Sequence, residues 1–539
     1  MTPTDAAIDE WIAEELAARP VLATTLGVAG HDDRLGDLGA SAWEARAAAD
    51  RRWAGRLDGL IGSTTDPDAQ ADLTMLLAEL AGRAVMHDWQ AWRRDPDLYV
   101  QPVLHGVHEL FLHRLRPDVE LVAATVARLR ELPDVVAAAR ANLDPELAPR
   151  LLVQRGRDGA EAGATYLRDL LAGSVDDPAL QADLAAAGAA AAEQLDDLAA
   201  HLAALAERAR GDWAIGEQRY SALLRTRELL PFDAAELTQR GEAAWAQLAA
   251  AMTECAARVE PGGRGWHELV QALATDHPAD PEAMRVAYEA SCADARAFLV
   301  ERGLVTLPEG EELHVVPSPV FERPLLAVAS YSGPAPFTAS RVGRFFVPFP
   351  PAGTTAEQLE QRLADNGHHA IPTTAVHEAY PGHHWQLTWS AATPRPLRKV
   401  LWSSYFVEGW ALYAEKMMHE QGFFTDPRQE LCHLDARLFR AARMVVDTSL
   451  HAGAMTVEEA VAFMSQRATL TPAVARAEVD RYCSWPTQAP SYLTGSLEIE
   501  RMRDRWFGEG RGDLRAFHDA VAANPGLPLP LTERVTFGP

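Results

Sequence analysis

Residues 374–384 read Thr-Ala-Val-His-Glu-Ala-Tyr-Pro-Gly-His-His and lie within a segment of otherwise helical character. The related motif His-Glu-x-x-His is typical of zinc hydrolases, because two imidazoles one helical turn apart bind one ion while the intervening Glu moves protons. His377 and Glu378 begin such a motif, but Pro381 occupies the position of the second His. The spacing therefore departs from the regular motif.

The next histidines are His383 and His384, six and seven residues after His377. On a straight helix the first would point about 120° away and the second would lie about 10 Å along the axis, whereas zinc lies about 2.1 Å from each ligand nitrogen. We therefore expect a bulge or kink at Pro381 and Gly382, because proline removes a backbone hydrogen bond and glycine tolerates unusual dihedral angles.

A third ligand is expected from another helix. Residues 406–415 read Phe-Val-Glu-Gly-Trp-Ala-Leu-Tyr-Ala-Glu, and Glu408 lies 31 residues after His377. Glu408 and Glu415 share one helical face, where two carboxylates among apolar side chains are costly unless a cation or a metal neutralises them. Gly409 permits the close approach of a neighbouring helix. The alternative is an amphipathic helix whose two carboxylates are simply solvated.

The whole chain has 539 residues, more than a single core usually contains, so two lobes or a large elongated helical body are expected. Acidic residues outnumber basic ones by 76 to 50, and the net charge of -26 argues against nucleic acid or an anionic membrane as a partner. Four widely spaced cysteines indicate core thiols. With neither a leader pattern nor a long apolar run visible, we expect a cytoplasmic location.

Helical periodicity dominates residues 1–310, which we expect to form an N-terminal lobe. Residues 311–350 change to short β-rich runs, and residues 351–539 return to helical periodicity in the region that carries the candidate metal ligands. The sequence therefore predicts a mainly α protein, an elongated multi-helix body with a small embedded β ribbon or sheet and an internal cleft.

Individual elements are predicted from apolar spacing, turns and capping residues. Helices are expected over residues 69–90, 118–143, 178–210, 234–258, 356–366, 373–391, 397–420, 427–451, 456–468, 472–484 and 490–507. Strands are expected over Leu313–Val316, Leu325–Tyr331 and Arg344–Phe349. Thr456 with Glu459 predicts a capping box, and Thr471 before Pro472 predicts the start of a helix.

Several further stretches carry a resemblance to a known family. They are Val407-Glu-Gly-Trp-Ala-Leu-Tyr-Ala-Glu415, Arg443-Met-Val-Val-Asp-Thr-Ser-Leu-His451 and Trp485-Pro-Thr-Gln-Ala-Pro-Ser-Tyr-Leu-Thr-Gly495, with Ile215-Gly-Glu217, Tyr220, Phe517-His-Asp519 and Leu527-Pro-Leu529. Together with residues 377–384, they make most of the chain resemble the bacterial family catalogued as domain of unknown function 885. The resemblance implies a helical, metallopeptidase-like protein of the gluzincin type, in which two His and one Glu bind one zinc ion.

The chain is also distantly similar to the carboxypeptidase Taq and thimet oligopeptidase groups, whose His-Glu-x-Gly-His helix precedes a Glu-bearing helix and a later Tyr segment. Dipeptidyl peptidase III is similar in another way, because one extra residue precedes its Gly-His pair and zinc still binds. On that comparison the implied zinc ligands are His377, His383 and Glu408, and His384 remains the alternative to His383.

Two residues are candidates for catalysis. Glu378 is the candidate general base, which would take a proton from the attacking water and return it to the leaving amine. Tyr492 lies in a Pro-Ser-Tyr-Leu-Thr-Gly segment that resembles the Tyr loop of the carboxypeptidase group. Its hydroxyl is a candidate donor to the oxyanion, and the alternative is an ordinary buried tyrosine. Gln488, four residues earlier, is expected to bind substrate or to support the site.

A second set of residues is expected to bind substrate or to support the ligands: His384, Glu415, Arg443, Asp447, His451, Gln488 and Tyr331. Arg443, Asp447 and His451 share one helical face. Arg443 would bind a substrate carboxylate or Asp447 would orient a zinc ligand, and an Arg443–Asp447 salt bridge is the alternative. The strand around Tyr331 is a candidate edge for an extended peptide.

Four other histidines are expected to take no part in metal binding. His368, His369 and His419 are predicted to lie on the surface. His518 is predicted to order the C-terminal turn of the chain.

The leading hypothesis is a hydrolase of short peptides or small amides that uses one zinc ion. One alternative uses the same two His and one Glu as the facial triad of a non-haem iron oxygenase. Glu378 argues against it, because an oxygenase needs no general base beside its ligand. The other alternative is a non-catalytic binding protein on the same fold, and intact ligand-type residues argue against that.

Overall fold

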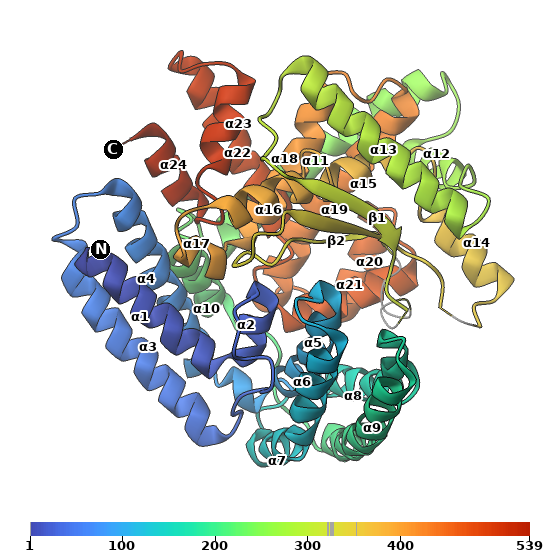
Figure 1. The fold of residues 1–539 in the computed structure, drawn as a ribbon. Coiled ribbons are helices and arrows are strands. Elements are labelled where there is room, and N and C mark those ends of the chain that lie inside the picture. The colour runs from blue at the N-terminus through green and yellow to red at the C-terminus, as the bar shows by residue number, and fades with distance from the viewer. Residues whose placement is uncertain (1, 321–322, 324–327, 352, 539) are drawn as a thin grey trace. The chain divides into compact units, whose positions relative to one another are not determined.

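The computed structural model describes residues 2–320, 323, 328–351 and 353–538, which form a mainly helical protein with one three-stranded sheet (Figure 1). This confirms the predicted fold class of a mainly α protein with a small embedded sheet, while the elongated shape and internal cleft stay predictions. The chain divides into two compact units, Met1–Ile215 with Ala335–Ala339, and Gly216–Pro334 with Ser340–Pro539. The division lies at residue 215 instead of the expected 310.

Residues 216–310 belong with the C-terminal region because their helices pack against helices from it. α11 (Ala234–Val259) lies along α19 (Pro427–His451), and α13 (Pro281–Arg302) packs against α15 (Ile371–Glu378). Met252 and Cys255 of α11 share one buried cluster with Leu431 and Leu438 of α19. Both sides of residue 215 have the same helical periodicity, so the sequence pattern does not mark this boundary.

The first unit consists mainly of nine α-helices in its described residues. They are α1 (Pro3–Ala18), α2 (Pro20–Leu26), α3 (Ala40–Ile61), α4 (Pro67–Asp88), α5 (Asp97–His113), α6 (Asp118–Arg130), α7 (Leu132–Asn142), α8 (Arg150–Thr165) and α9 (Pro178–Ala206). The single helix expected over 118–143 is divided into α6 and α7. Pro133 lies in the first turn of α7, where its missing N–H interrupts the hydrogen-bond ladder of a continuous helix.

The second unit contains the sheet and the remaining helices. Besides α11, α13, α15 and α19, these are α10 (Glu217–Ala222), α12 (Trp266–Leu273), α14 (Ala356–Ala364), α16 (His383–Ala392), α17 (Leu397–Val400), α18 (Ser404–Glu420), α20 (Val457–Arg467), α21 (Pro472–Ser484), α22 (Ser491–Gly508), α23 (Leu514–Ala522) and α24 (Leu529–Phe537). The helix expected over 397–420 is divided, because Ser403 starts α18 by accepting a hydrogen bond from the backbone N–H of Tyr405.

The sheet has the strand order β1-β3-β2. β1 (Glu312–Pro317) pairs in parallel with β3 (Val342–Val347), and β2 (Ser330–Ser332) pairs with β3 in the antiparallel direction. The first and third expected strands are confirmed. The second was expected to start at Leu325, which lies outside the described residues, and Tyr331 is in β2 opposite Phe345.

Local signals place several helix starts correctly. Thr456 and Glu459 form the expected capping box of α20. Thr471 caps α21, and Pro472 is its first residue. All four cysteines are free, and three of them are buried, as expected for core thiols.

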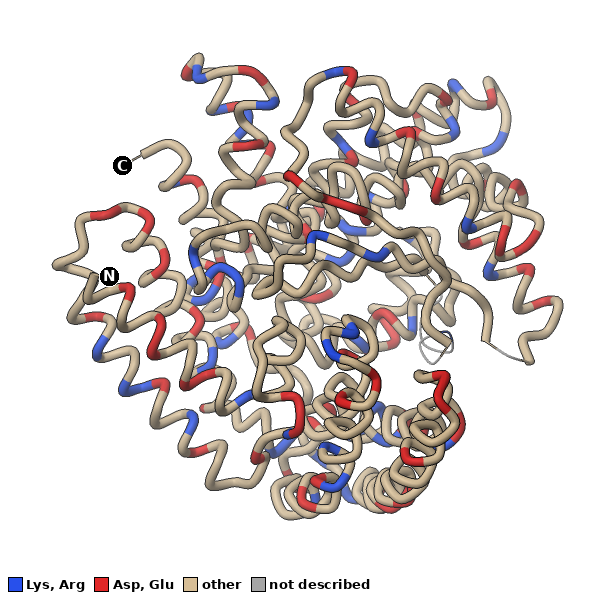
Figure 2. The backbone as a smooth tube through the Cα atoms, in the orientation of Figure 1, with Lys and Arg blue, Asp and Glu red and all other residues tan. Residues whose placement is uncertain are grey.

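Acidic and basic side chains are interspersed along the described helices, with acidic ones more numerous in the sequence (Figure 2). Basic side chains therefore have acidic side chains nearby in sequence and in space with which they can form ion pairs. Within the described residues, no helix has both the length and the apolar character needed to cross a bilayer.

The expected close helix contact at Gly409 is confirmed. α18 crosses α22 there, and a Cβ on Gly409 would lie 2.5 Å from the Cα of Gly495. A Cβ on Gly495 would lie 2.0 Å from the carbonyl oxygen of Tyr405. Backbone atoms on both sides leave no flexible group that could move aside. This contact fixes α18, which carries Glu408, against α22, which carries Tyr492 in its first turn.

Replacement of Gly495 by alanine is expected to destabilise the protein by about 1–3 kcal/mol, because the added methyl group forces α18 and α22 apart. The measurement is the free energy of unfolding in urea. Gly508 at the end of the same helix has open space around it, so Gly508→Ala is the matched control and is expected to leave stability unchanged or slightly raised. Equal stability of Gly495→Ala and the unmodified protein would contradict the close contact.

Candidate metal centre

The first two candidate ligands lie on either side of a break between two helices. α15 ends at Glu378, α16 begins at His383, and the linker between them contains a cis peptide bond between Tyr380 and Pro381. The expected bulge or kink inside one helix over 373–391 is therefore wrong in form, although its place is correct. Two separate helices, joined by the four residues Ala379 to Gly382, therefore replace the expected continuous helix.

Gly382 makes this path possible. Its N–H donates to the carbonyl oxygen of Val376 at 3.0 Å. A Cβ at this position would lie 1.9 Å from the carbonyl oxygen of His377 and 2.3 Å from that of Val376. The indole Nε1 of Trp410 donates to the carbonyl oxygen of Pro381 at 2.7 Å and ties the linker to α18. The linker therefore requires glycine at position 382 and is held by the buried side chain of Trp410.

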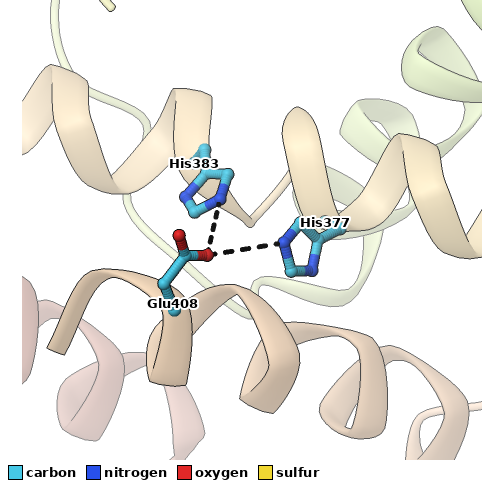
Figure 3. Close-up of side chains that lie close together, drawn as sticks. All are labelled: His377, His383 and Glu408. Atoms are coloured by element: carbon cyan, nitrogen blue, oxygen red, sulfur yellow. Dashed lines mark ion pairs between the residues drawn. The ribbon is translucent and has the colours of Figure 1, made fainter. Parts of the chain in front are cut away.

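This path brings His377, His383 and Glu408 together from α15, α16 and α18 (Figure 3). Glu408 Oε2 lies 3.4 Å from His383 Nε2 and 3.9 Å from His377 Nε2. One ligand atom from each residue lies within 4.8 Å of the other two. Among the described residues, this is the group of His, Cys, Asp and Glu side chains whose geometry suits a metal ion.

The three donors fit a zinc ion. Around a tetrahedral zinc about 2.0–2.1 Å from each donor, neighbouring donor atoms lie roughly 3.4 Å apart, so only small side-chain movements are needed. Two neutral imidazoles and one carboxylate are a donor set that zinc accepts, and a fourth position stays open for a small molecule. The side chains of His383 and Glu408 are 12% and 20% exposed, so solvent reaches the group.

Glu408 is held as a carboxylate. Burial alone would raise its pKa, but hydrogen bonds with His383 and Tyr492 and the nearby charge of His377 hold the pKa at about 2. Burial alone would lower the pKa of His383, whereas Glu408 raises it above the ordinary value. The pair therefore concentrates negative charge where a cation would bind.

Glu415 supports His377 from the opposite side. Its Oε1 lies 2.6 Å from His377 Nδ1, and its Oε2 lies 3.4 Å from Nδ1 of His433. All three side chains are buried. Burial alone would raise the pKa of Glu415, but the two histidines lower it to about 2. A carboxylate at Nδ1 leaves Nε2 of His377 facing Glu408, which is the orientation that a metal ligand needs.

Sequence reasoning did not identify His433. It lies on α19, ten residues before Arg443, and no motif or spacing connects it with Glu415 on α18. Helical periodicity indicates only that His433 lies on the buried face of α19 with Arg437. Its partner is set by the packing of α18 against α19.

Glu378 lies beside the group without belonging to it. Its side chain is partly exposed. Burial raises the pKa of the carboxyl group, and the charge of Glu408 acts in the same direction, while His377, His383 and Arg440 oppose the shift. A carboxyl group with a raised pKa accepts and returns a proton more readily near neutral pH than an ordinary glutamate.

Tyr492 at the start of α22 also lies at the site. Its ring stacks on the ring of His377 with 6.3 Å between the centroids. Its hydroxyl contributes to the lowered pKa of Glu408, and Nε2 of Gln488 donates to the hydroxyl oxygen at 3.5 Å. Burial and the neighbouring Glu408 charge raise the pKa of Tyr492, so the hydroxyl keeps its proton. The structure therefore places Gln488 and Tyr492 together beside the three candidate ligands.

His384 faces away from the group. Its Nε2 lies 3.0 Å from Glu311 Oε2 and its Nδ1 lies 3.0 Å from the hydroxyl of Tyr331. The hydroxyl of Tyr380 also donates to Glu311 at 2.5 Å. Geometry thus groups His383 with His377 and leaves His384 in a buried network that holds the linker against β2. Tyr331 lies in β2, an edge strand of the sheet, so the expectation that an extended peptide lies along this strand stays a prediction.

Arg443, Asp447 and His451 share a face of α19 but do not contact the three candidate ligands. Arg443 is buried and forms its ion pair with Glu478 at 2.7 Å, so the considered Arg443–Asp447 salt bridge is replaced by another pair. Asp447 accepts a hydrogen bond from the Tyr220 hydroxyl at 2.5 Å and one from the Thr487 backbone N–H at 3.1 Å.

His451 lies 3.0 Å through Nε2 from the carbonyl oxygen of Tyr482. Burial raises the pKa of Asp447 to about 7, in opposition to its hydrogen bonds. The role of Asp447 as support for a zinc ligand is therefore not supported, because Glu415 takes that position on His377. These residues hold α19, α21 and the Tyr492 segment together.

The other four histidines divide between surface and core. His368 is exposed as expected, and His419 is partly exposed. His369 is buried and lies 3.0 Å from Asp276, so its surface prediction is wrong. His518 is buried between the Tyr413 hydroxyl and the carbonyl oxygen of Leu304, at 2.8 and 2.7 Å.

The ion pair of Arg443 gives stability that depends on pH. Burial alone would raise the pKa of Glu478, but Arg443, Arg481 and the Tyr482 hydroxyl lower it to about 2. A carboxyl group whose pKa is lower in the folded state stabilises the protein fully above its unfolded pKa of about 4.3 and loses this effect as the pH falls toward about 2.

We expect Glu478→Gln to cost about 2 kcal/mol near neutral pH and progressively less between about pH 5 and pH 3, measured by urea unfolding across that range. Glu458 is an exposed carboxylate, with 77% of its side chain accessible, and Glu458→Gln is the control. A stability difference for Glu478→Gln that stays constant across the range would contradict the lowered pKa.

Two solved structures resemble this fold over nearly the whole chain. One is described as a putative lipoprotein of unknown function from Shewanella oneidensis, with a TM-score of 0.81, 21% identity, and coverage of 99% of this chain and 100% of that one. The other is described as a putative lipoprotein from Colwellia psychrerythraea, with a TM-score of 0.82, 18% identity, and coverage of 97% and 96%. At these identities the likeness establishes the fold alone.

The description of both similar proteins as putative lipoproteins overturns the expectation of a cytoplasmic location, which rested on finding neither a leader pattern nor a long apolar run in the sequence. No curated protein matches the sequence. The sequence family described as "Bacterial protein of unknown function (DUF885)" matches residues 20–535. With that match over almost its entire length, the chain belongs to the bacterial family of unknown function DUF885.

Proposed function

We propose that this protein is a zinc-dependent hydrolase of peptide or amide bonds. The observation that carries the proposal is the meeting of His377, His383 and Glu408 from three helices, with the partly exposed Glu378 next in sequence to the first of them. A structural zinc site more often uses cysteine thiolates and needs no additional carboxylate. The chemistry of these four residues therefore favours catalysis over structural support.

Glu378 and Tyr492 have different roles in the proposed reaction. A bound zinc ion would polarise the scissile carbonyl group and make water more acidic. The Glu378 carboxylate, which follows His377 directly and is partly exposed, takes a proton from the attacking water and returns it to the nitrogen of the leaving amine. The Tyr492 hydroxyl keeps its proton and donates a hydrogen bond to the developing oxyanion.

Glu415 positions the first ligand. It fixes the imidazole of His377 through the 2.6 Å contact with Nδ1, and its other oxygen lies 3.4 Å from His433 Nδ1, so His377 does not rotate away from Glu408. The fixed orientation lowers the cost of ordering the ligand when a metal binds. The same three ligands would also hold iron, but Glu378 has a role in hydrolysis and none in oxygen activation.

Purified protein is expected to contain about one zinc per chain and to cleave members of a peptide library, as read by plasma and peptide mass spectrometry respectively. Glu378→Gln removes the proton carrier and is expected to lower turnover by about 10²–10⁴-fold while zinc content stays the same. Stoichiometric iron in place of zinc would favour an oxygenase. Zinc without cleavage of any peptide by either protein would restrict the proposal to small amides.

Glu415→Gln is expected to weaken zinc affinity about 10–100-fold, because the amide is a poorer acceptor for the His377 ring and leaves His433 poorly paired. Competition with a chromophoric chelator measures the affinity. Glu420→Gln changes an exposed carboxylate at the end of the same helix and is expected to bind zinc normally. Unchanged affinity in Glu415→Gln would show that His377 is not a ligand or needs no orientation.

A further inference from the structure

One arginine near the site has no carboxylate partner. α19 carries four arginines, of which Arg428 pairs with Asp426, Arg437 with Glu500 and Arg443 with Glu478. Arg440 forms no ion pair with any carboxylate of the described residues, and its hydrogen bond runs from Nη1 to the carbonyl oxygen of Ala436 in its own helix, at 3.2 Å. The charge of Arg440 acts to lower the pKa of Glu415 and Asp435 from a distance, but in a chain with a net charge of -26 the lack of a direct ion pair is not explained by a shortage of acidic residues.

The guanidinium group of Arg440 has at least one N–H donor without an acceptor. Its Nε is buried and has no hydrogen-bond partner within the described part of the chain, although the side chain as a whole is partly exposed. A guanidinium has five N–H donors in a planar fork, and leaving a buried donor unpaired costs free energy. A carboxylate that reaches this side chain would supply the missing acceptor in a two-point contact.

The position of Arg440 connects it with the candidate metal centre. Its Cζ lies 5.7 Å from the centroid of the Tyr492 ring, which stacks on His377 at 6.3 Å. Its charge also opposes the raised pKa of Glu378, as expected for a neighbour of that carboxyl group. Arg443 is closer to Tyr492, at 4.8 Å, but Glu478 already neutralises it.

We propose that Arg440 binds a carboxylate of the substrate on the leaving-group side of the scissile bond, one or two residues beyond it. The inference rests on the proposed function and names its substrate class. An extended chain advances about 3.3–3.6 Å per residue, so one or two residues span the short path from the metal centre past Tyr492 to the guanidinium. The substrate is then a peptide or an N-acyl amino acid with a free C-terminal or side-chain carboxylate.

The surrounding charge makes this contact selective. An acidic protein repels acidic substrates, and at physiological ionic strength charges are screened over about 8 Å, so a local unpaired cation is needed to hold a carboxylate near Glu378 and Glu408. The sequence pointed to Arg443 for this task. Because Arg443 is buried and paired, the structure moves the assignment one helical turn back along α19.

The test uses binding, so it does not depend on turnover. Calorimetry on Glu378→Gln compares N-acetyl-trialanine that ends in a free carboxylate with the same peptide amide. The free acid is expected to bind about 10–100-fold more tightly, the range that corresponds to one charge-assisted contact. A second pair of peptide amides ends in Glu or Gln and reports a side-chain carboxylate. A preference confined to the Glu peptide would assign Arg440 to the side chain instead of the C-terminus.

When Arg440→Gln is combined with Glu378→Gln, the preference for the free carboxylate is expected to disappear. The affinity for the peptide amide is expected to change by less than about twofold. Addition of Arg428→Gln, on the same helix and paired with Asp426, is the control and is expected to keep the preference. If Arg440→Gln does not fold by circular dichroism, Arg440→Lys replaces it and is expected to reduce the preference several-fold, because lysine lacks the planar fork.

Equal binding of acid and amide in both peptide pairs would overturn the inference, as would an equal loss of both in the Arg440 variant. The latter result would mean that Arg440 acts on the site as a whole. Failure of the proposed function is a separate outcome, because it appears as a lack of cleavage by zinc-loaded protein with Glu378 intact, whatever the ratio of acid to amide binding.

Discussion

The candidate site depends on the contact of Gly382 with the end of α15. The carbonyl oxygens of Val376 and His377 lie so close to this residue that no side chain fits. Because of this close contact, α15 ends and α16 begins only four residues later. His377 and His383, whose spacing would keep them apart on a straight helix, can therefore lie close together. Trp410 and the Glu311 network hold the linker from two sides, so the path is fixed before any ion binds.

Buried charge is the second constraint. Glu408 and Glu415 lie on one face of α18 among apolar side chains, and imidazole groups are their nearest charged or polar partners, while the charge of Arg440 also lowers the pKa of Glu415. Such carboxylates stay ionised only while their partners remain in place. The histidines are thereby oriented by the same interactions that keep the carboxylates charged. The same contacts between carboxylates and imidazoles therefore stabilise the core and orient the side chains that would bind a cation.

The family assignment and the fold do not decide the function. The similar structures are described as proteins of unknown function or only as putative lipoproteins, and identities of 18% and 21% carry the fold and no more. The case for hydrolysis therefore comes from the site itself. It consists of three convergent candidate ligands, an adjacent carboxyl group with a raised pKa, and a protonated tyrosine stacked on one of the three.

The sequence by itself determined the helical class, the place of the small sheet, most helix starts and the residues that meet at the site, because apolar periodicity, capping residues and motif chemistry are local properties. It left His383 and His384 as alternatives and gave no sign of His433 or of the unpaired Arg440. Tertiary structure decided these points, because the rotation of α16 after the Gly382 linker and the packing of α18 against α19 set which side chains meet. Such contacts join residues far apart in the chain, and no local pattern encodes them.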